Sequence, residues 1–130
     1  MPKPVILVID DEPMWRNLLD RLLNSADYKV YTAATCADGI RMAGLYQPDC
    51  ILLDFNLGDG TAVEVCSAIR SNKNIKKTPI IIFSSDPDAA ISCYTQCKAD
   101  KFIPKGLPLP ELLTVIEGIL RGAQCAASNE

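Results

Sequence analysis

Short apolar runs alternate with helix-like segments along almost the whole of the 130-residue chain. The runs are too short for helices and are expected to be strands, at residues 5–9, 29–32, 50–54, 79–83 and 101–103. The intervening segments repeat apolar residues at helical spacing, near residues 13–23, 35–47, 62–69, 86–97 and 107–120. This alternation predicts an α/β fold, a doubly wound parallel sheet with right-handed crossovers and helices on both faces.

Local signals mark several helix ends. Thr35 and Asp38 form a weak capping box, and Pro13 suits a first helical position. Asp86 and Pro87 predict an N-cap and first position for the fourth helix, running to about residue 97. The chain length fits one domain, predicted over residues 1–121. Residues 122–130 are small and polar and are expected to fray as a C-terminal tail or the start of a linker.

Composition excludes several classes of protein. A hydrophobic fraction of 48% and a charged fraction of 22% are typical of a globular chain rather than a disordered one. The net charge is −3 and no basic stripe occurs, so direct binding of nucleic acid is not predicted. The apolar runs at residues 5–9 and 79–83 are far shorter than the ~20 residues of a membrane span. The first residues show no signal-peptide pattern.

Six cysteines and no histidine limit the possible metal chemistry. Because no CxxC pair occurs, a zinc site would need irregularly spaced cysteines only, which is not expected. Cys93 and Cys97 are one helical turn apart, so a redox or metal role stays open. The favoured interpretation is that the cysteines fill the core as small apolar residues. Reduced thiols favour a cytoplasmic location. The cysteines are residues 36, 50, 66, 93, 97 and 125.

Reactive side chains follow four of the five predicted strands. Asp10 and Asp11 come after the first strand, Asp54 closes the third, Ser84 follows the fourth and Lys105 comes just after the fifth. Ligands of an open parallel sheet bind outside the carboxyl ends of its strands, so these groups are expected to converge at one edge. Each residue has an ordinary explanation as a helix cap, a strand-end cap or a solvated side chain. Their joint occurrence at one edge favours a site.

The groups suit one chemistry. Mg²⁺ prefers oxygen ligands and is commonly held by one or two carboxylates together with phosphate and water. A carboxylate can attack phosphorus to form an acyl phosphate, which makes Asp54 a candidate nucleophile. The added negative charge can be stabilised by the cation and by the ammonium of Lys105. The Ser84 hydroxyl can donate a hydrogen bond to a phosphoryl oxygen.

The motifs VILVIDDEP, ILLDFNLGDG, IIFSS and FIPK resemble the receiver domain of two-component response regulators, over about residues 4–121. The resemblance implies a flavodoxin-like five-stranded parallel sheet, in the order 2-1-3-4-5, with five helices. It implies that Asp54 is the phosphoacceptor and that Asp10 and Asp11 are an acidic pair for Mg²⁺ or Mn²⁺. Asp54 itself and the backbone carbonyl of Asn56 are the further metal ligands implied.

The same resemblance assigns a switch and an output. It implies that Ser84 is the switch hydroxyl, Lys105 the phosphate-sensing lysine and Phe102 the aromatic switch. The phosphate would come from a sensor histidine kinase or a histidine phosphotransfer protein, and the downstream effector stays unidentified. The fourth helix, fifth strand and fifth helix would form the output surface, with Ile91, Tyr94, Phe102 and Val115 as contacts. A monomer or weak dimer without membrane contact is expected.

The chain departs from the family pattern in its loops. Gly58 replaces a proline and Ala62 replaces a glycine, which predicts a looser loop after Asp54. Gly106 replaces the proline that follows the lysine, so the Lys105–Gly106 bond is expected to be trans. Ser85 stands where a very small residue is usual and is expected to crowd the phosphoryl pocket slightly.

Two alternatives stay open. A pseudo-receiver would bind partners without phosphorylation, although the complete acidic set argues against it. A phosphatase of the haloacid dehalogenase type also uses an aspartate nucleophile and Mg²⁺, but it needs a second aspartate where this chain has Asn56. No enzyme activity beyond self-phosphorylation and self-dephosphorylation is expected.

Overall fold

Five parallel strands form one central sheet in a computed structural model that describes residues 2–128, with the side chains of residues 2–122. The strand order is β2-β1-β3-β6-β7, which confirms the predicted order 2-1-3-4-5 because β4 and β5 lie outside this sheet. The strands are β1 Val5–Ile9, β2 Lys29–Ala33, β3 Cys50–Leu53, β6 Ile80–Ser84 and β7 Lys101–Pro104. The edge position of β7 suits Pro104, which has no N–H to donate.

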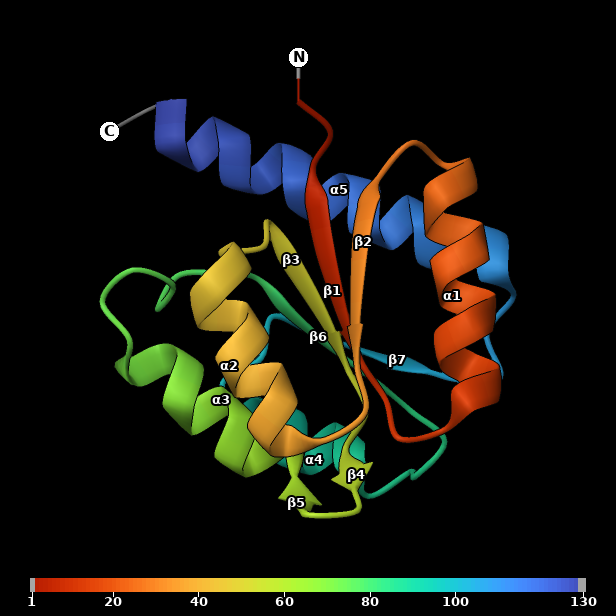
Figure 1. The fold of residues 1–130 in the computed structure, drawn as a ribbon, viewed down its shortest axis with the longest axis vertical. Helices are drawn as coiled ribbons and strands as arrows, with labels where there is room; N and C mark the ends of the chain where they lie inside the picture. Colours follow the sequence, from red (N-terminus) through yellow and green to blue (C-terminus); the bar gives the residue numbers. More distant parts are fainter. Residues whose placement is uncertain (1, 129–130) are drawn as a thin grey trace.

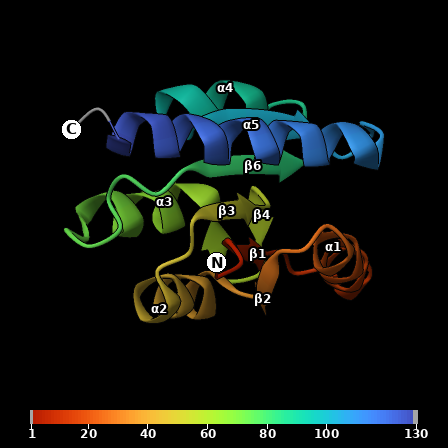
Figure 2. The same cartoon turned by 90° about the horizontal axis from the view of Figure 1, so that it is seen from above.

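Five helices cover the two faces of the sheet, as Figure 1 shows. They are α1 Pro13–Ser25, α2 Cys36–Tyr46, α3 Ala62–Ser71, α4 Ala89–Thr95 and α5 Leu109–Ser128. Buried residues of α2, α3 and α4 share one apolar cluster, and those of α1 and α5 share another. Figure 2 shows α1 and α2 on opposite sides of the β1–β2 part of the sheet. Over residues 2–128, no helix is long and apolar enough to cross a membrane.

Strand side chains alternate between these two clusters. In β1, Leu7 and Ile9 belong to the cluster under α2 and α3, while Ile6 and Val8 belong to the cluster under α1 and α5. This alternation follows from the two-residue period of a strand, and it explains why the runs are apolar on both faces. Gly39 lets α2 approach β1 closely, since a Cβ atom there would lie 2.6 Å from Cδ1 of Ile9.

Two helix boundaries differ from the predicted ones. The fourth helix spans Ala89–Thr95 rather than Pro87 to about residue 97, and it begins late because Asp86 closes a separate turn. The Asp86 Oδ1 accepts from the Asp88 N–H at 2.9 Å, and the Asp86 carbonyl accepts from the Ala89 N–H at 3.1 Å. At the other end of the chain, α5 continues through Gly122 to Ser128, where a frayed segment was expected. One glycine costs a helix only about 1 kcal/mol, and alanines with high helix propensity follow it.

The segment after β3 forms a small hairpin that the sequence did not predict. Strands β4 Asn56–Leu57 and β5 Gly60–Thr61 pair antiparallel. Between them, the Asp59 carboxylate accepts from the N–H groups of Cys36 at 2.7 Å and Ala37 at 3.1 Å. These bonds lower the pKa of Asp59. The predicted loose loop is therefore tied to the start of α2.

A capping box fixes the other end of this hairpin. The Thr61 hydroxyl accepts from the Val63 N–H at 3.2 Å, and the Glu64 carboxylate accepts from the Thr61 N–H at 2.9 Å. Both contacts satisfy backbone donors that the first turn of α3 would otherwise leave without partners. The hairpin that follows Asp54 is thus anchored to both α2 and α3.

Candidate functional site

Asp54 stands directly after β3, at the carboxyl edge of the sheet. Its N–H donates to the carbonyl of Ile9 at 2.8 Å, which continues the pairing of β3 with β1 for one more residue. Its Oδ1 accepts from the N–H of Phe55 at 2.8 Å. Asp54 is 7% exposed, so a buried strand delivers one carboxylate to a nearly enclosed position.

Asp10 takes the equivalent position after β1. Its N–H donates to the carbonyl of Ala33 at 3.0 Å, and its Oδ1 accepts from the N–H of Glu12 at 2.9 Å. The Asp10 carbonyl accepts from the Arg16 guanidinium at 2.7 Å. These contacts fix a carboxylate that is only 2% exposed.

Lys105 reaches both carboxylates from the end of β7. Its Nζ lies 2.8 Å from Oδ2 of Asp10 and 3.3 Å from Oδ2 of Asp54, and its side chain is 4% exposed. Burial acts to lower the pKa of Lys105, but the two carboxylates outweigh it and raise that pKa. The ammonium therefore stays charged and bridges two acids from different strands.

The pKa of Asp54 is raised from 3.8 to about 6. Burial is the largest cause and the Asp10 carboxylate is the second, while Lys105 and the Phe55 N–H act in the opposite direction. Asp54 is thus mainly ionised near neutral pH, but its charge is poorly solvated. A carboxylate in this state is suited to bind a cation or to attack an electrophile.

Two aromatic rings enclose the ammonium of Lys105. Its Nζ lies 5.1 Å from the ring centroid of Trp15 and 6.0 Å from that of Phe83. The two rings meet edge to face, with centroids 5.3 Å apart and an interplanar angle of 88°. Cation–π attraction therefore adds to the ion pairs. Neither ring was predicted from the sequence as part of the site, because only the fold brings α1, β6 and β7 together here.

Four carboxylates form an oxygen-rich cluster at this edge. Asp10, Asp11, Glu12 and Asp54 each offer an oxygen, and these oxygens lie within 4.8 Å of one another. Asp11 and Glu12 are exposed, while Asp10 and Asp54 are buried. Hard divalent cations such as Mg²⁺ take this kind of ligand and keep several waters, so the residues fit the predicted metal. Glu12 was not predicted as a member, although its place in the acidic run was a usable signal.

Ser84 and Asn56 lie at the same edge and share one neighbour. The Ser84 hydroxyl accepts from the N–H of Asp86 at 3.1 Å. The side-chain amide of Asn56 donates to Oδ2 of Asp86 at 3.3 Å. Asp86 thus joins the loop after β6 to the hairpin after Asp54. The sequence predicted only a helix start at Asp86 and Pro87, and did not reveal this link. Roles for Ser84 and for the Asn56 carbonyl stay predictions.

The ends of β6 and β7 are held together. The Lys105 N–H donates to the carbonyl of Ser84 at 3.1 Å, directly after Pro104. No cis peptide bond occurs in the described chain, so the Lys105–Gly106 bond is trans, as predicted. Ser85, predicted to crowd the pocket, is exposed. The role of Lys105 as the phosphate-sensing lysine stays a prediction.

The predicted output surface has exposed apolar side chains on α4. Ile91 is 71% exposed and Tyr94 is 58% exposed. Phe102 on β7 and Val115 on α5 are half-buried and pack against different clusters, on opposite faces of the sheet. The role of Phe102 as an aromatic switch stays a prediction.

The cysteines with described side chains are free and buried, in line with a core-filling role. Cys36 and Cys66 lie at or within the helices α2 and α3, and Cys50 lies in β3. Cys93 lies in α4 and Cys97 follows it. Cys125 lies outside the residues whose side chains the structure describes.

Comparison with known proteins gives a consistent result. A family profile described as response regulator receiver domain matches residues 6–117. Transcriptional regulatory protein KdpE of Mycobacterium tuberculosis is 30% identical over 127 residues, 97% of this chain and 55% of that protein. The chain therefore spans about half the length of this curated relative.

Solved structures agree with that result. The signal receiver domain of a putative Luxo repressor protein from Vibrio parahaemolyticus superposes with a TM-score of 0.86 at 24% identity, covering 98% of each chain. The receiver domain of sensor histidine kinase PA1611 from Pseudomonas aeruginosa has a TM-score of 0.81 at 22% identity, covering 91% of this chain and 98% of that one. That receiver domain was crystallised with a magnesium ion coordinated in its active-site cleft.

Proposed function

This chain belongs to the response regulator receiver domains, and from that premise we propose that it is a magnesium-dependent phosphoacceptor whose reactive group is Asp54. One observation carries the proposal. The Asp54 carboxylate is nearly buried, lies beside the carboxylate of Asp10 and contacts the Lys105 ammonium at 3.3 Å. A lone surface aspartate has neither the cation-binding neighbours nor the counter-charge that phosphoryl transfer requires.

We infer that Asp10, Asp11 and Asp54 hold the cation, with Glu12 and the Asn56 carbonyl as further candidates. A bound Mg²⁺ would neutralise part of the phosphoryl charge and orient the group for in-line attack. Lys105, whose Nζ lies 3.3 Å from Oδ2 of Asp54, is positioned to supply a second positive charge. The carboxylates of Asp10 and Asp54, which now share the Lys105 ammonium, would then face two positive charges: that ammonium and the metal ion.

The transfer step needs only one bond to form and one to break. An Asp54 carboxylate oxygen attacks the phosphorus of a phosphohistidine, and the bond from phosphorus to the imidazole nitrogen breaks. The imidazole leaves with the electron pair and takes up a proton from solvent. Water later attacks the acyl phosphate and restores Asp54. The chain would therefore accept and release phosphate without turning over an external substrate.

The proposed donor is a sensor histidine kinase or a histidine phosphotransfer protein in the cytoplasm. Support comes from the family membership and from the two-component regulators among its relatives. Phosphorylation would change the surface formed by α4, β7 and α5, with Ser84 and Phe102 as the switch residues. An effector of unknown identity would bind there.

Mass measurement of the intact protein tests the phosphoacceptor. The protein is incubated with Mg²⁺ and acetyl phosphate, and one added phosphoryl group is expected. Asp54→Ala removes the adduct, whereas Asp88→Ala should keep it, because Asp88 is an exposed acid outside the cluster. No adduct with any donor would favour the pseudo-receiver. Many turnovers of phosphate esters would favour the phosphatase.

Asp11→Ala tests the metal site separately. Asp11 is exposed and belongs to the acidic cluster, so its loss should weaken Mg²⁺ binding without disturbing the core. We expect a higher dissociation constant in a Mg²⁺ titration and slower phosphorylation at limiting Mg²⁺. An unchanged titration would mean that the cluster only caps the start of α1.

A further inference from the structure

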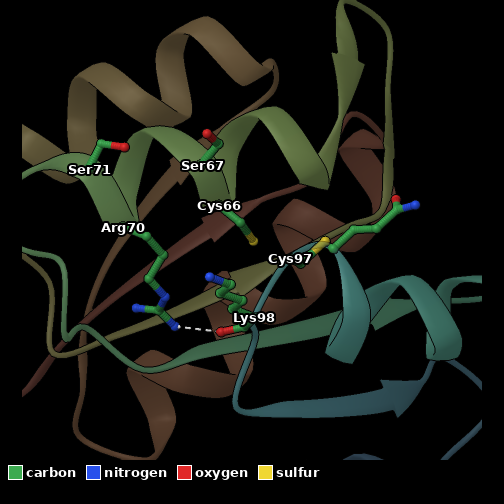
Figure 3. Close-up of a pocket in the computed structure, with 7 residues that line it drawn as sticks. Cys66, Ser67, Arg70, Ser71, Cys97 and Lys98 are labelled. Carbon is green, nitrogen blue, oxygen red and sulfur yellow. Dashed lines mark hydrogen bonds between the residues drawn. The ribbon is translucent and has the colours of Figure 1, made fainter.

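Two cysteines from different elements line one pocket that does not include Asp54. The pocket has a volume of about 370 Å³. Cys66 and Arg70 reach it from α3, and Cys97 and Lys98 reach it from the segment between α4 and β7. Figure 3 shows the sulfurs of Cys66 and Cys97 turned into the space between these two elements.

Hydrogen bonds to backbone carbonyls fix the segments that carry the two cysteines. Nη2 of Arg70 donates to the carbonyl of Lys98 at 3.1 Å, as drawn in Figure 3. Arg70 stands one helical turn after Cys66, and Lys98 directly follows Cys97, so this bond aligns the two thiols. The Cys97 N–H also donates to the carbonyl of Ser92 at 2.9 Å, and Lys98 has a left-handed φ of 51°. The segment that carries Cys97 is thus fixed relative to α3.

The two sulfurs face each other across the pocket, as Figure 3 shows. Hydrogen bonding between the two thiols lowers the pKa of Cys97 and raises that of Cys66. Burial raises the pKa of Cys36 and of Cys93 to about 11, and that of Cys50 to about 12. Among the cysteines with described side chains, Cys97 is the one whose pKa is lowered, and Cys66 lines the same pocket.

We propose that Cys66 and Cys97 form a dithiol site that small hydroperoxides oxidise to an intramolecular disulfide. Both residues are 1% exposed, so a bulky disulfide reagent cannot approach either sulfur closely. Hydrogen peroxide is about the size of water and fits the pocket. Arg70, Gln96 and Lys98 also line the pocket, so its wall is polar and suits a polar oxidant.

The reaction balances in two steps. The Cys97 thiolate attacks one peroxide oxygen, the O–O bond breaks, and the released hydroxide takes up a proton to become water. Cys97 is then a sulfenic acid. The Cys66 sulfur attacks the Cys97 sulfur, the S–O bond breaks, and the hydroxyl leaves as water with the proton from Cys66. Two thiols lose two electrons, and one peroxide is reduced to two waters. The product covalently joins α3 to the segment that precedes β7.

Peroxide treatment of the full reduced chain tests this site. We expect the intact mass to fall by two hydrogen atoms and the change to be reversed by dithiothreitol. Trypsin should release residues 42–70 and 78–98 as one linked pair before reduction. Each of these peptides contains two cysteines, so fragmentation must locate the link at Cys66 and Cys97 rather than at Cys50 or Cys93.

Matched variants separate this site from general thiol oxidation. Cys66→Ser and Cys97→Ser should each abolish the disulfide, whereas Cys93→Ser should form it at an unchanged rate. Asp54→Asn should also leave it unchanged, so the result is independent of the proposed phosphorylation. A link that involves any other cysteine, a link between two chains, or oxidation of Cys97 without a link would overturn the proposal. The wild-type peptide map decides the question even if a variant folds poorly.

Discussion

Replacing Asp54 by asparagine should stabilise the metal-free protein while removing the proposed phosphoacceptor. The pKa of Asp54 is raised from 3.8 to about 6, so folding at neutral pH transfers a charge into a less favourable environment. Each pKa unit corresponds to about 1.4 kcal/mol, which sets an upper limit of about 3 kcal/mol for the gain. Solvent still reaches 9% of the Asp54 side chain, and screening there reduces the expected gain to about 1–2 kcal/mol.

Asparagine keeps the shape of the side chain and one acceptor oxygen. The hydrogen bond from the Phe55 N–H, now 2.8 Å long, can therefore persist. Lys105 also keeps its stronger partner, because Asp10 lies 2.8 Å from its Nζ. The substitution thus removes mainly the unfavourable charge. Asp88→Asn is the matched control, since Asp88 is exposed, and a surface change there should alter stability by less than about 0.5 kcal/mol.

Urea unfolding in EDTA measures the difference, and its pH dependence fixes the sign. An acid whose folded pKa is raised above its unfolded pKa destabilises the fold when ionised in both states. The gain from Asp54→Asn should therefore be full above about pH 6 and vanish as the pH falls toward 3.8. Two results would refute this reasoning: a variant that is less stable than wild type at pH 7, or a stability difference between the two proteins that does not change with pH.

Magnesium should stabilise wild type more than Asp54→Asn. A cation that binds only the folded state stabilises it by about 1.4 kcal/mol at ten times its dissociation constant. Wild type should gain this stabilisation, and Asp54→Asn should gain less because it lacks one ligand charge. The difference in free energy of unfolding between wild type and Asp54→Asn should therefore become smaller or change sign in Mg²⁺. An equal gain in both proteins would exclude Asp54 from the cation site.

The remaining predictions concern the site lysine and the packing of helices. Lys105→Met should lower the free energy of unfolding in EDTA by about 3 kcal/mol, because it leaves two buried carboxylates facing each other; unchanged urea unfolding would mean that the ion pairs are unimportant. Gly39→Ala should destabilise by about 1–3 kcal/mol, since its Cβ would lie 2.6 Å from Ile9. A Cβ added at Gly118 in α5 meets nothing within 4 Å, so Gly118→Ala should stabilise the protein by up to about 1 kcal/mol in the same assay. If Gly39→Ala and Gly118→Ala changed stability in the same direction, the packing argument would be contradicted.

The sheet was predictable because its strands are buried on both faces. The runs at β1, β3 and β6 are apolar without interruption, and their carboxyl ends carry Asp10, Asp54 and Ser84. Parallel connection then brings these ends to one edge whatever the details of the loops. The strand order and the convergence of Asp10, Asp54 and Lys105 follow from those facts and from the resemblance to receiver domains.

The predictions that were wrong or missing concern features set by competing local hydrogen bonds or by contacts between distant segments. Asp86 was expected to cap α4, but its carboxylate and carbonyl close a turn instead, and the helix starts at Ala89. Gly58 and Ala62 suggested a loose loop, yet Asp59 ties that hairpin to α2 from a distance of 23 positions in the sequence. The spacing of Cys66 and Cys97 likewise did not reveal that they line one pocket.

Trp15 is the one tryptophan of the chain, and it sits against the site. The Lys105 ammonium lies 5.1 Å from its ring centroid, so the electric field at the indole depends on where that charge is held. A cation or a phosphoryl group that draws the ammonium away from Asp10 changes this field, and the emission of the indole changes with it. We therefore expect the fluorescence of Trp15 to report, without any label, whether the acidic edge is occupied.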